Sequence, residues 1–176
     1  MFPELQVKET YGYHFLRVAG AEGDDVIAAV LKRLGGQYSL KVLIASDRDF
    51  LQLSDVCQLN LQGQEVLPMI GEEQVSPQEY LQCKILMGDG SDNIGQVFNK
   101  VGAKRALKLV RDKEKLKKML KESQDAAKQY FLNKKLISFD EMPKELEDKI
   151  AEAASRELYS EEAINSQVDF SDFMMM

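Results

Sequence analysis

The 176-residue chain has few of the features on which several common functions depend. Its single histidine, His14, lies among apolar and aromatic residues, so we do not expect catalysis by a histidine base. The only cysteines, Cys57 and Cys83, lack the spacing of zinc ligands and are interpreted as reduced core residues. No apolar run approaches membrane-spanning length, and the first residues do not resemble a signal peptide. We therefore expect a soluble, cytoplasmic protein without a membrane partner.

The chain does contain seven carboxylates in three short motifs, each of which directly follows an apolar segment. The motifs are Gly20-Ala-Glu-Gly-Asp-Asp25, Ala45-Ser-Asp-Arg-Asp-Phe50 and Gly88-Asp-Gly-Ser-Asp-Asn93. The acidic residues are Glu22, Asp24, Asp25, Asp47, Asp49, Asp89 and Asp92. Crowded carboxylates repel one another unless a multivalent cation neutralises them. Ligands that are all oxygen suit Mg²⁺ or Mn²⁺ better than zinc, and two such ions are suited to phosphodiester chemistry.

Each acidic motif also has a purely structural interpretation. Aspartate caps helices and accepts backbone hydrogen bonds in turns, so any one motif can be explained as local structure. We favour a metal site because the three motifs occur together. A Ca²⁺- or Mg²⁺-binding protein that does not act on nucleic acid is a further alternative, but it leaves the basic residues of the chain unexplained.

Those basic residues are concentrated in one segment, although the net charge of the chain is −6. Ten lysines and arginines lie between Lys100 and Lys121, opposed only by Asp112 and Glu114. A basic segment combined with an acidic metal cluster is typical of a nuclease. The alternative is a lysine-rich helix face that is merely solvated.

The apolar pattern predicts an α/β fold with a parallel sheet. Strands are expected over 13–18, 41–45 and 56–61, with an amphipathic helix over 24–34 and a short helix over 49–53. Because ligands of such sheets bind at the carboxyl ends of the strands, the acidic motifs are expected to meet there. Further helices are expected over 77–87, 113–122, 124–133 and 144–158. A turn containing glycine leads into the basic segment, a shape that presents backbone N–H groups to phosphate.

In this order, the motifs resemble those of the 5′-nuclease (flap endonuclease) superfamily. That group includes phage 5′–3′ exonucleases, the 5′-nuclease part of bacterial DNA polymerase I and the ribonuclease H of T-even phages. Val101-Gly-Ala-Lys-Arg-Ala106 is similar to the second turn of its helix-three-turn-helix DNA-binding motif. The resemblance covers roughly residues 13–143. It implies a partial PIN-like (resolvase-like) nuclease domain over 1–87, a helix-three-turn-helix and C-terminal helical region over 88–158, and a flexible tail over 159–176.

The resemblance also implies roles for single residues. Glu22, Asp24 and Asp25 would bind or orient a first metal ion, Asp47 and Asp49 would be shared, and Asp89 and Asp92 would complete a second site. Of these, Glu22, Asp24, Asp47 and Asp49 would form the catalytic group. Gly102, Lys104, Arg105 and Lys108 would hold duplex phosphates without reading sequence. The implied cofactors are two Mg²⁺ or Mn²⁺ ions, with K⁺ bound by carbonyls near residues 97–101.

The implied function is metal-dependent 5′–3′ exonuclease or flap endonuclease activity, including ribonuclease H-like primer removal during DNA replication. The substrate would be a duplex, a flap or an RNA–DNA hybrid, and the partners would include a sliding clamp and a single-stranded-DNA-binding protein. If a phage encodes the chain, the location would be the host cytoplasm. The alternative is a non-catalytic DNA-binding or clamp-interacting module derived from such a nuclease.

Three features of the chain qualify this resemblance. The hairpin before the basic segment, Gly95-Gln-Val-Phe-Asn-Lys-Val-Gly102, has Asn99 or Lys100 where the family has a glycine. Only about twenty residues precede the first acidic motif, where the family has a strand with a metal-binding aspartate and a helical arch. We therefore expect this chain to be the C-terminal part of a nuclease, which needs a separate N-terminal half and has negligible activity alone. Near the end, Gln167, Phe170 and Phe173 have the spacing of a sliding-clamp-binding peptide, although an acidic end with incidental phenylalanines is an equal alternative.

Overall fold

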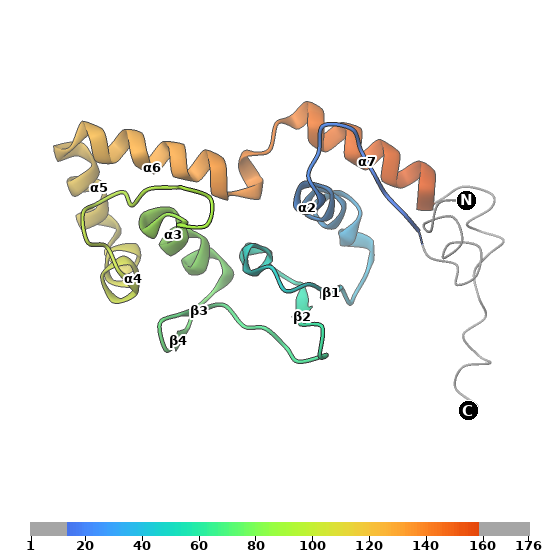
Figure 1. Cartoon of the computed structure of the whole chain (residues 1–176), viewed down its shortest axis with the longest axis horizontal. Coiled ribbons are helices and arrows are strands. Elements are labelled where there is room, and N and C mark those ends of the chain that lie inside the picture. The colour runs from blue at the N-terminus through green and yellow to red at the C-terminus, as the bar shows by residue number, and fades with distance from the viewer. Residues whose placement is uncertain (1–13, 159–176) are drawn as a thin grey trace. The chain divides into compact units, whose positions relative to one another are not determined.

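The computed structural model describes residues 14–158, so the proposed clamp-binding residues Gln167, Phe170 and Phe173 lie outside the described part (Figure 1). Contacts divide the chain into two compact units, and each is described by itself. Among the described residues, one unit comprises 14–36 and 143–158, and the other comprises 37–142. The domain boundaries inferred from the sequence remain a prediction.

Two helices form the described part of the first unit. Helix α2 (Gly23–Arg33) packs against α7 (Lys144–Leu158), and a 3₁₀ turn, η1 (Gly35–Gln37), follows α2. Small buried residues, Ala28 and Ala29 of α2 and Ala154 of α7, allow the helices to approach closely. Both helices lie where the sequence predicts them.

A buried carboxylate reinforces this helix pair. Glu147 of α7 is only 8% exposed and accepts hydrogen bonds from Lys32 Nζ at 3.0 Å and Arg33 Nη1 at 3.4 Å. The second guanidinium nitrogen of Arg33 pairs with Asp148 at 2.9 Å. Because a buried charge is costly without partners, these pairs fix the register of the two helices.

The strand predicted over 13–18 is wrong for the part that the structure describes. Residues 14–18 form no strand, and Phe15 is 44% exposed. Apolar and β-branched residues favour a strand only where a neighbouring strand supplies hydrogen bonds and packing. No described strand pairs with this segment.

The second unit contains the predicted parallel sheet. Strands β1 (Val42–Ile44) and β2 (Cys57–Leu59) pair in parallel, with Val42 opposite Cys57 and Ile44 opposite Leu59. The predicted short helix between them is the 3₁₀ helix η2 (Arg48–Gln52). A small antiparallel hairpin of β3 (Met69–Ile70) and β4 (Glu73–Gln74), absent from the sequence prediction, follows.

Helix α3 (Pro77–Met87) is the centre of the second unit. It begins with reciprocal hydrogen bonds between Ser76 and Glu79, and it buries Tyr80, Cys83 and Leu86. It packs against α4 (Ala103–Arg111), α6 (Gln124–Ile137) and η2, while α5 (Lys113–Glu122) connects α4 to α6. The 3₁₀ turn η3 (Phe139–Glu141) ends the unit. Among residues 14–158, no helix is long and apolar enough to cross a membrane.

Candidate metal centre and nucleic-acid interface

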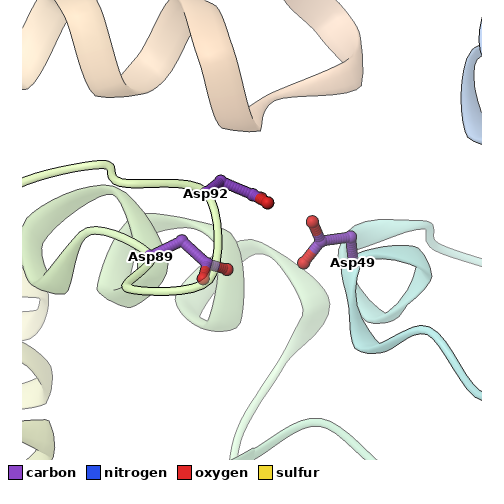
Figure 2. Close-up of side chains that lie close together, drawn as sticks. All are labelled: Asp49, Asp89 and Asp92. Atoms are coloured by element: carbon purple, nitrogen blue, oxygen red, sulfur yellow. The ribbon is translucent and has the colours of Figure 1, made fainter.

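Three of the seven predicted acidic residues come together in the second unit. Asp49 of η2 and Asp89 and Asp92 of the loop after α3 each offer a carboxylate oxygen, and these oxygens lie within 4.8 Å of one another. Figure 2 shows the three side chains directed toward a common space. Asp49 and Asp89 are partly buried and Asp92 is exposed, so the cluster is open to solvent on one side.

The turn after β1 positions Asp49. Asp47 caps η2, because its Oδ1 accepts a hydrogen bond from the Asp49 backbone N–H at 2.8 Å. Gln58 of β2 donates from Nε2 to the carbonyl oxygens of Ala45 at 2.9 Å and Asp47 at 2.6 Å. The carboxylate of Asp47 is thus used locally, while that of Asp49 is directed into the cluster.

The loop after α3 positions Asp89 and requires a glycine at its first residue. Gly88 has φ +71°, and a Cβ there would lie 2.3 Å from the Ile94 carbonyl oxygen. Asp89 and Ile94 exchange two backbone hydrogen bonds, of 3.0 and 2.8 Å, which close the loop. Asp89 Oδ1 also accepts from the backbone N–H of Ser91 at 3.0 Å and from its hydroxyl at 2.5 Å. These bonds fix the direction of the carboxylate.

Lys84 is a residue of the candidate site that the sequence analysis missed. Its Nζ donates to Asp49 Oδ1 and lies 2.9 Å from Asp89 Oδ2, so it connects the two acidic turns. Its side chain is only 13% exposed. The signal that the sequence offered was the single lysine of the helix predicted over 77–87, which lies between Cys83 and Ile85 and five positions before Asp89.

The pKa values reflect this crowding. Hydrogen bonds from Ser91 and Lys84 lower the pKa of Asp89 to about 2. Burial raises the pKa of Asp49, and this effect outweighs the opposing hydrogen bond from Lys84. Burial lowers the pKa of Lys84, but the hydrogen bonds to Asp49 and Asp89 more than reverse this, so its pKa is raised. Lys84 therefore stays charged, and its ammonium pairs with two of the three clustered acidic side chains.

The donor set fits a hard divalent cation. Its ligand atoms are all carboxylate oxygens, which Mg²⁺ and Mn²⁺ accept, and no described cysteine or histidine belongs to the cluster. Three carboxylates with one lysine leave an excess of negative charge, which a divalent ion would balance. Asp49, Asp89 and Asp92 are the residues that would hold it.

The first acidic motif belongs to the other unit, where its residues have local capping roles. Asp25 Oδ2 accepts from the Glu22 backbone N–H at 3.2 Å, and Asp24 Oδ1 accepts from the Asp25 N–H at 2.9 Å. Both are hydrogen bonds of a helix N-terminus. The roles of Glu22, Asp24 and Asp25 in metal binding remain a prediction.

The predicted DNA-binding residues lie on or beside α4. Gly102 caps its N-terminus, and Lys104, Arg105 and Lys108 are exposed on it. Lys104 and Lys108 line a groove of about 950 Å³ between α4 and the β3–β4 hairpin. Arg111, also in the groove, is paired with Glu73 at 2.7 Å and Glu79 at 2.8 Å, which ties the hairpin to α3 and α4.

The segment before α4, residues 95–102, forms a turn although it lacks the glycine that the resemblance led us to expect. Lys100 has φ +56°, the left-handed conformation that glycine favours. Two side chains brace it, since Gln96 Nε2 donates to the Val101 carbonyl at 3.1 Å and Arg105 Nη1 donates to the Asn99 carbonyl at 3.0 Å. The turn is therefore held by local hydrogen bonds in place of glycine.

No protein-family model matches the chain. Its sequence is 32% identical over 114 residues to the 5′-3′ exonuclease of Buchnera aphidicola subsp. Schizaphis graminum, covering 62% of this chain and 39% of that protein. It is 35% identical over 121 residues to the thermostable DNA polymerase I of Thermus thermophilus, covering 66% of this chain and 14% of the polymerase. With DNA polymerase I of Streptococcus pneumoniae it shares 31% identity over 162 residues, covering 79% of this chain and 18% of that polymerase. The chain thus spans only part of each relative.

Solved structures of T5 5′-exonuclease have the same fold. One mutant of that enzyme aligns with a TM-score of 0.62 and 21% identity, covering 78% of this chain and 66% of the other. The T5 D15 flap endonuclease crystallised with DNA and metal ions aligns with a TM-score of 0.64 and 21% identity, covering 85% and 63%. The predicted α/β fold class is confirmed by this likeness. In sequence, the chain is similar to a part of proteins named 5′-3′ exonuclease and DNA polymerase I, and it has the fold of T5 5′-exonuclease.

Proposed function

We propose that this chain supplies metal ligands and a DNA-binding surface to a 5′–3′ exonuclease or flap endonuclease. The observation that carries the proposal is the convergence of Asp49, Asp89 and Asp92 within 4.8 Å. These three carboxylates would bind Mg²⁺ or Mn²⁺. Bound ions of this kind supply an activated water and stabilise charge on the attacking and leaving oxygens of a phosphodiester.

The other residues of the second unit would orient the nucleic acid. Lys104 and Lys108 would contact phosphates of a duplex, a flap or an RNA–DNA hybrid, and backbone N–H groups at the start of a helix such as α4 favour anions. Carbonyls of residues 97–101 are the proposed K⁺ ligands. One structural neighbour is a complex with DNA, which supports a nucleic-acid substrate. Ribonuclease H-like primer removal, a sliding clamp contacted through Gln167, Phe170 and Phe173, and a single-stranded-DNA-binding protein complete the proposal.

We propose this activity for a complete nuclease. Such a nuclease would combine this chain with the parts that its relatives have and that the chain does not match. The chain spans 39% of the Buchnera exonuclease, and we propose that a separate N-terminal half supplies the remaining catalytic groups. Removing electrostatic stabilisers of a transition state commonly costs a hundredfold or more in rate. The chain alone should therefore cleave negligibly.

A cleavage assay tests this function. A 5′-end-labelled flap duplex is incubated in Mg²⁺ with the chain alone, and with the chain plus the N-terminal segment of a related exonuclease. We expect cleavage only in the mixture, and none when the chain carries Asp89→Asn. If neither sample cleaves the flap but the chain still binds the duplex, the chain is instead a DNA-binding module derived from a nuclease.

A further inference from the structure

Two buried carboxamides hold the backbone of the turns that carry the clustered acids. Gln58 of β2 is 4% exposed and Asn133 of α6 is 0% exposed. We propose that Gln58 and Asn133 are positioning residues, which keep Asp49, Asp89 and Asp92 close enough to share one cation. Only the metal-binding consequence of this inference rests on the proposed function, because the turns and their hydrogen bonds are defined without a metal.

Gln58 fixes the first turn from the neighbouring strand. Its two Nε2 hydrogens are used by the carbonyl oxygens of Ala45, at 2.9 Å, and Asp47, at 2.6 Å. These residues flank Ser46, where the chain leaves β1 and turns into η2. The Asp47 side chain in turn accepts from the Asp49 N–H at 2.8 Å. A continuous series of hydrogen bonds thus runs from β2 to the backbone of Asp49.

Asn133 of α6 fixes the second turn. Its Nδ2 donates to the carbonyl oxygens of Ile85 and Gly95, both at 2.8 Å. Ile85 lies in the last turn of α3, and Gly95 follows the acidic loop, so this single side chain joins the two ends of the loop. Gln129 donates to Asn133 Oδ1 at 2.7 Å and fixes the orientation of the amide.

The bonding of Gln58 argues against a role in stability alone. Its Oε1 is buried and has no hydrogen-bond partner among the described residues. A buried acceptor without a partner destabilises a fold. Methionine has a similar shape and no such acceptor, so Gln58→Met should leave global stability almost unchanged while releasing the turn. If Gln58 served only core packing, this substitution would change neither the stability nor the order of the turn.

Amide hydrogen exchange of the full metal-free chain is the direct test. With Gln58→Met we expect the Asp49 amide to exchange about tenfold faster while the Ser91 amide is unaffected. With Asn133→Leu we expect the Ser91 amide to exchange about tenfold faster while the Asp49 amide is unaffected. Gln96→Met is the matched control, because it also removes a glutamine bond to a backbone carbonyl, that of Val101, but touches neither acidic turn. Exchange at both turns within twofold of the original rates would overturn the inference.

A second measurement separates this inference from the proposed function. Calorimetric titration with Mn²⁺ should show about tenfold weaker binding for Gln58→Met and Asn133→Leu, and no change for Gln96→Met. If the unaltered chain binds no Mn²⁺, the metal proposal fails, and the exchange rates still decide whether the carboxamides position the turns. If Asn133→Leu does not fold, Gln129→Met removes only the bond that orients Asn133, and the same acceleration at Ser91 is expected.

Discussion

At the scale of single residues, the candidate site depends on backbone conformations that few amino acids can adopt. Gly88 begins the acidic loop with φ +71° and ψ −172°, a region that is almost restricted to glycine. Asp89 then directs its carboxylate into the cluster through bonds to Ser91 and Lys84. The position of Asp89 therefore depends on this glycine and on the hydrogen bonds that follow it.

Gly88→Ala should destabilise the chain by about 3 kcal/mol or more. The added Cβ would lie 2.3 Å from the Ile94 carbonyl oxygen and 2.5 Å from that of Gly95, so the loop backbone would have to move. Urea unfolding gives the free energy difference. Gly90→Ala, with no atom within 4 Å of its added Cβ, is the control and should change stability by less than about 1 kcal/mol. Equal effects of the two substitutions would refute this account of the loop.

Asp89 should make the stability of the metal-free chain depend on acidic pH. Its pKa falls from 3.8 to about 2 on folding, so its contribution is present above pH 4 and is lost as the pH falls through 2. The shift corresponds to about 2 kcal/mol. Between pH 5 and pH 2, Asp89→Asn should therefore lose about 2 kcal/mol less stability than the original chain, as measured by urea unfolding at each pH. Identical pH profiles would show that Asp89 is not stabilised in this way.

At the scale of elements, α4 and the turn before it form the surface that we assign to DNA. The apolar face of α4 buries Ala106, Leu107 and Val110, which leaves Lys104, Arg105 and Lys108 exposed. The rest of the basic segment continues along α5. One face of α4 thus packs against the core, and the other face exposes positively charged side chains to solvent.

Lys104→Ala with Lys108→Ala should weaken duplex binding and its dependence on salt. Each lost phosphate contact lowers the slope of log affinity against log salt by about 0.9, so the double variant should lower it by about 2. Fluorescence anisotropy with a labelled duplex at several salt concentrations measures the slope. Lys128→Ala with Lys135→Ala removes the same charge from α6 and should leave the slope unchanged. Equal slopes for both double variants would place the interface elsewhere.

Lys100→Gly should stabilise the turn before α4 by about 0.5–1 kcal/mol. Lysine is strained in the left-handed conformation at φ +56°, and glycine is not. The free energy gained by relieving this strain exceeds the free energy cost of ordering glycine, which is more flexible in the unfolded chain. Thermal and urea unfolding provide the measurement. Asn99, the neighbouring residue, does not have positive φ, and Asn99→Gly should give no such gain. A loss of stability with Lys100→Gly would contradict the expected strain.

At the scale of the whole molecule, local sequence signals predicted most helices but not the contacts between elements. Ser76 and Pro77 mark the start of α3, and the predicted helix over 144–158 coincides with α7. The bonds from Asn133 to Ile85 and Gly95, and the bond from Lys84 to Asp49, join residues that are 35 to 48 positions apart, so no local pattern indicates them. The clustering of Asp49, Asp89 and Asp92 was predictable because acidic motifs follow apolar segments. The prediction of a strand over 13–18 failed because a strand forms only where a neighbouring strand pairs with it.

Binding of Mn²⁺ to the full chain, measured by calorimetry, tests the central claim most directly. We predict saturable binding that Asp49→Asn and Asp89→Asn each weaken at least about tenfold, since each removes a negative ligand. Asp125→Asn, which changes an exposed aspartate at the start of α6, should leave the affinity unchanged. The absence of saturable binding at millimolar Mn²⁺, or equal affinity in all three variants, would contradict a metal site formed by these carboxylates.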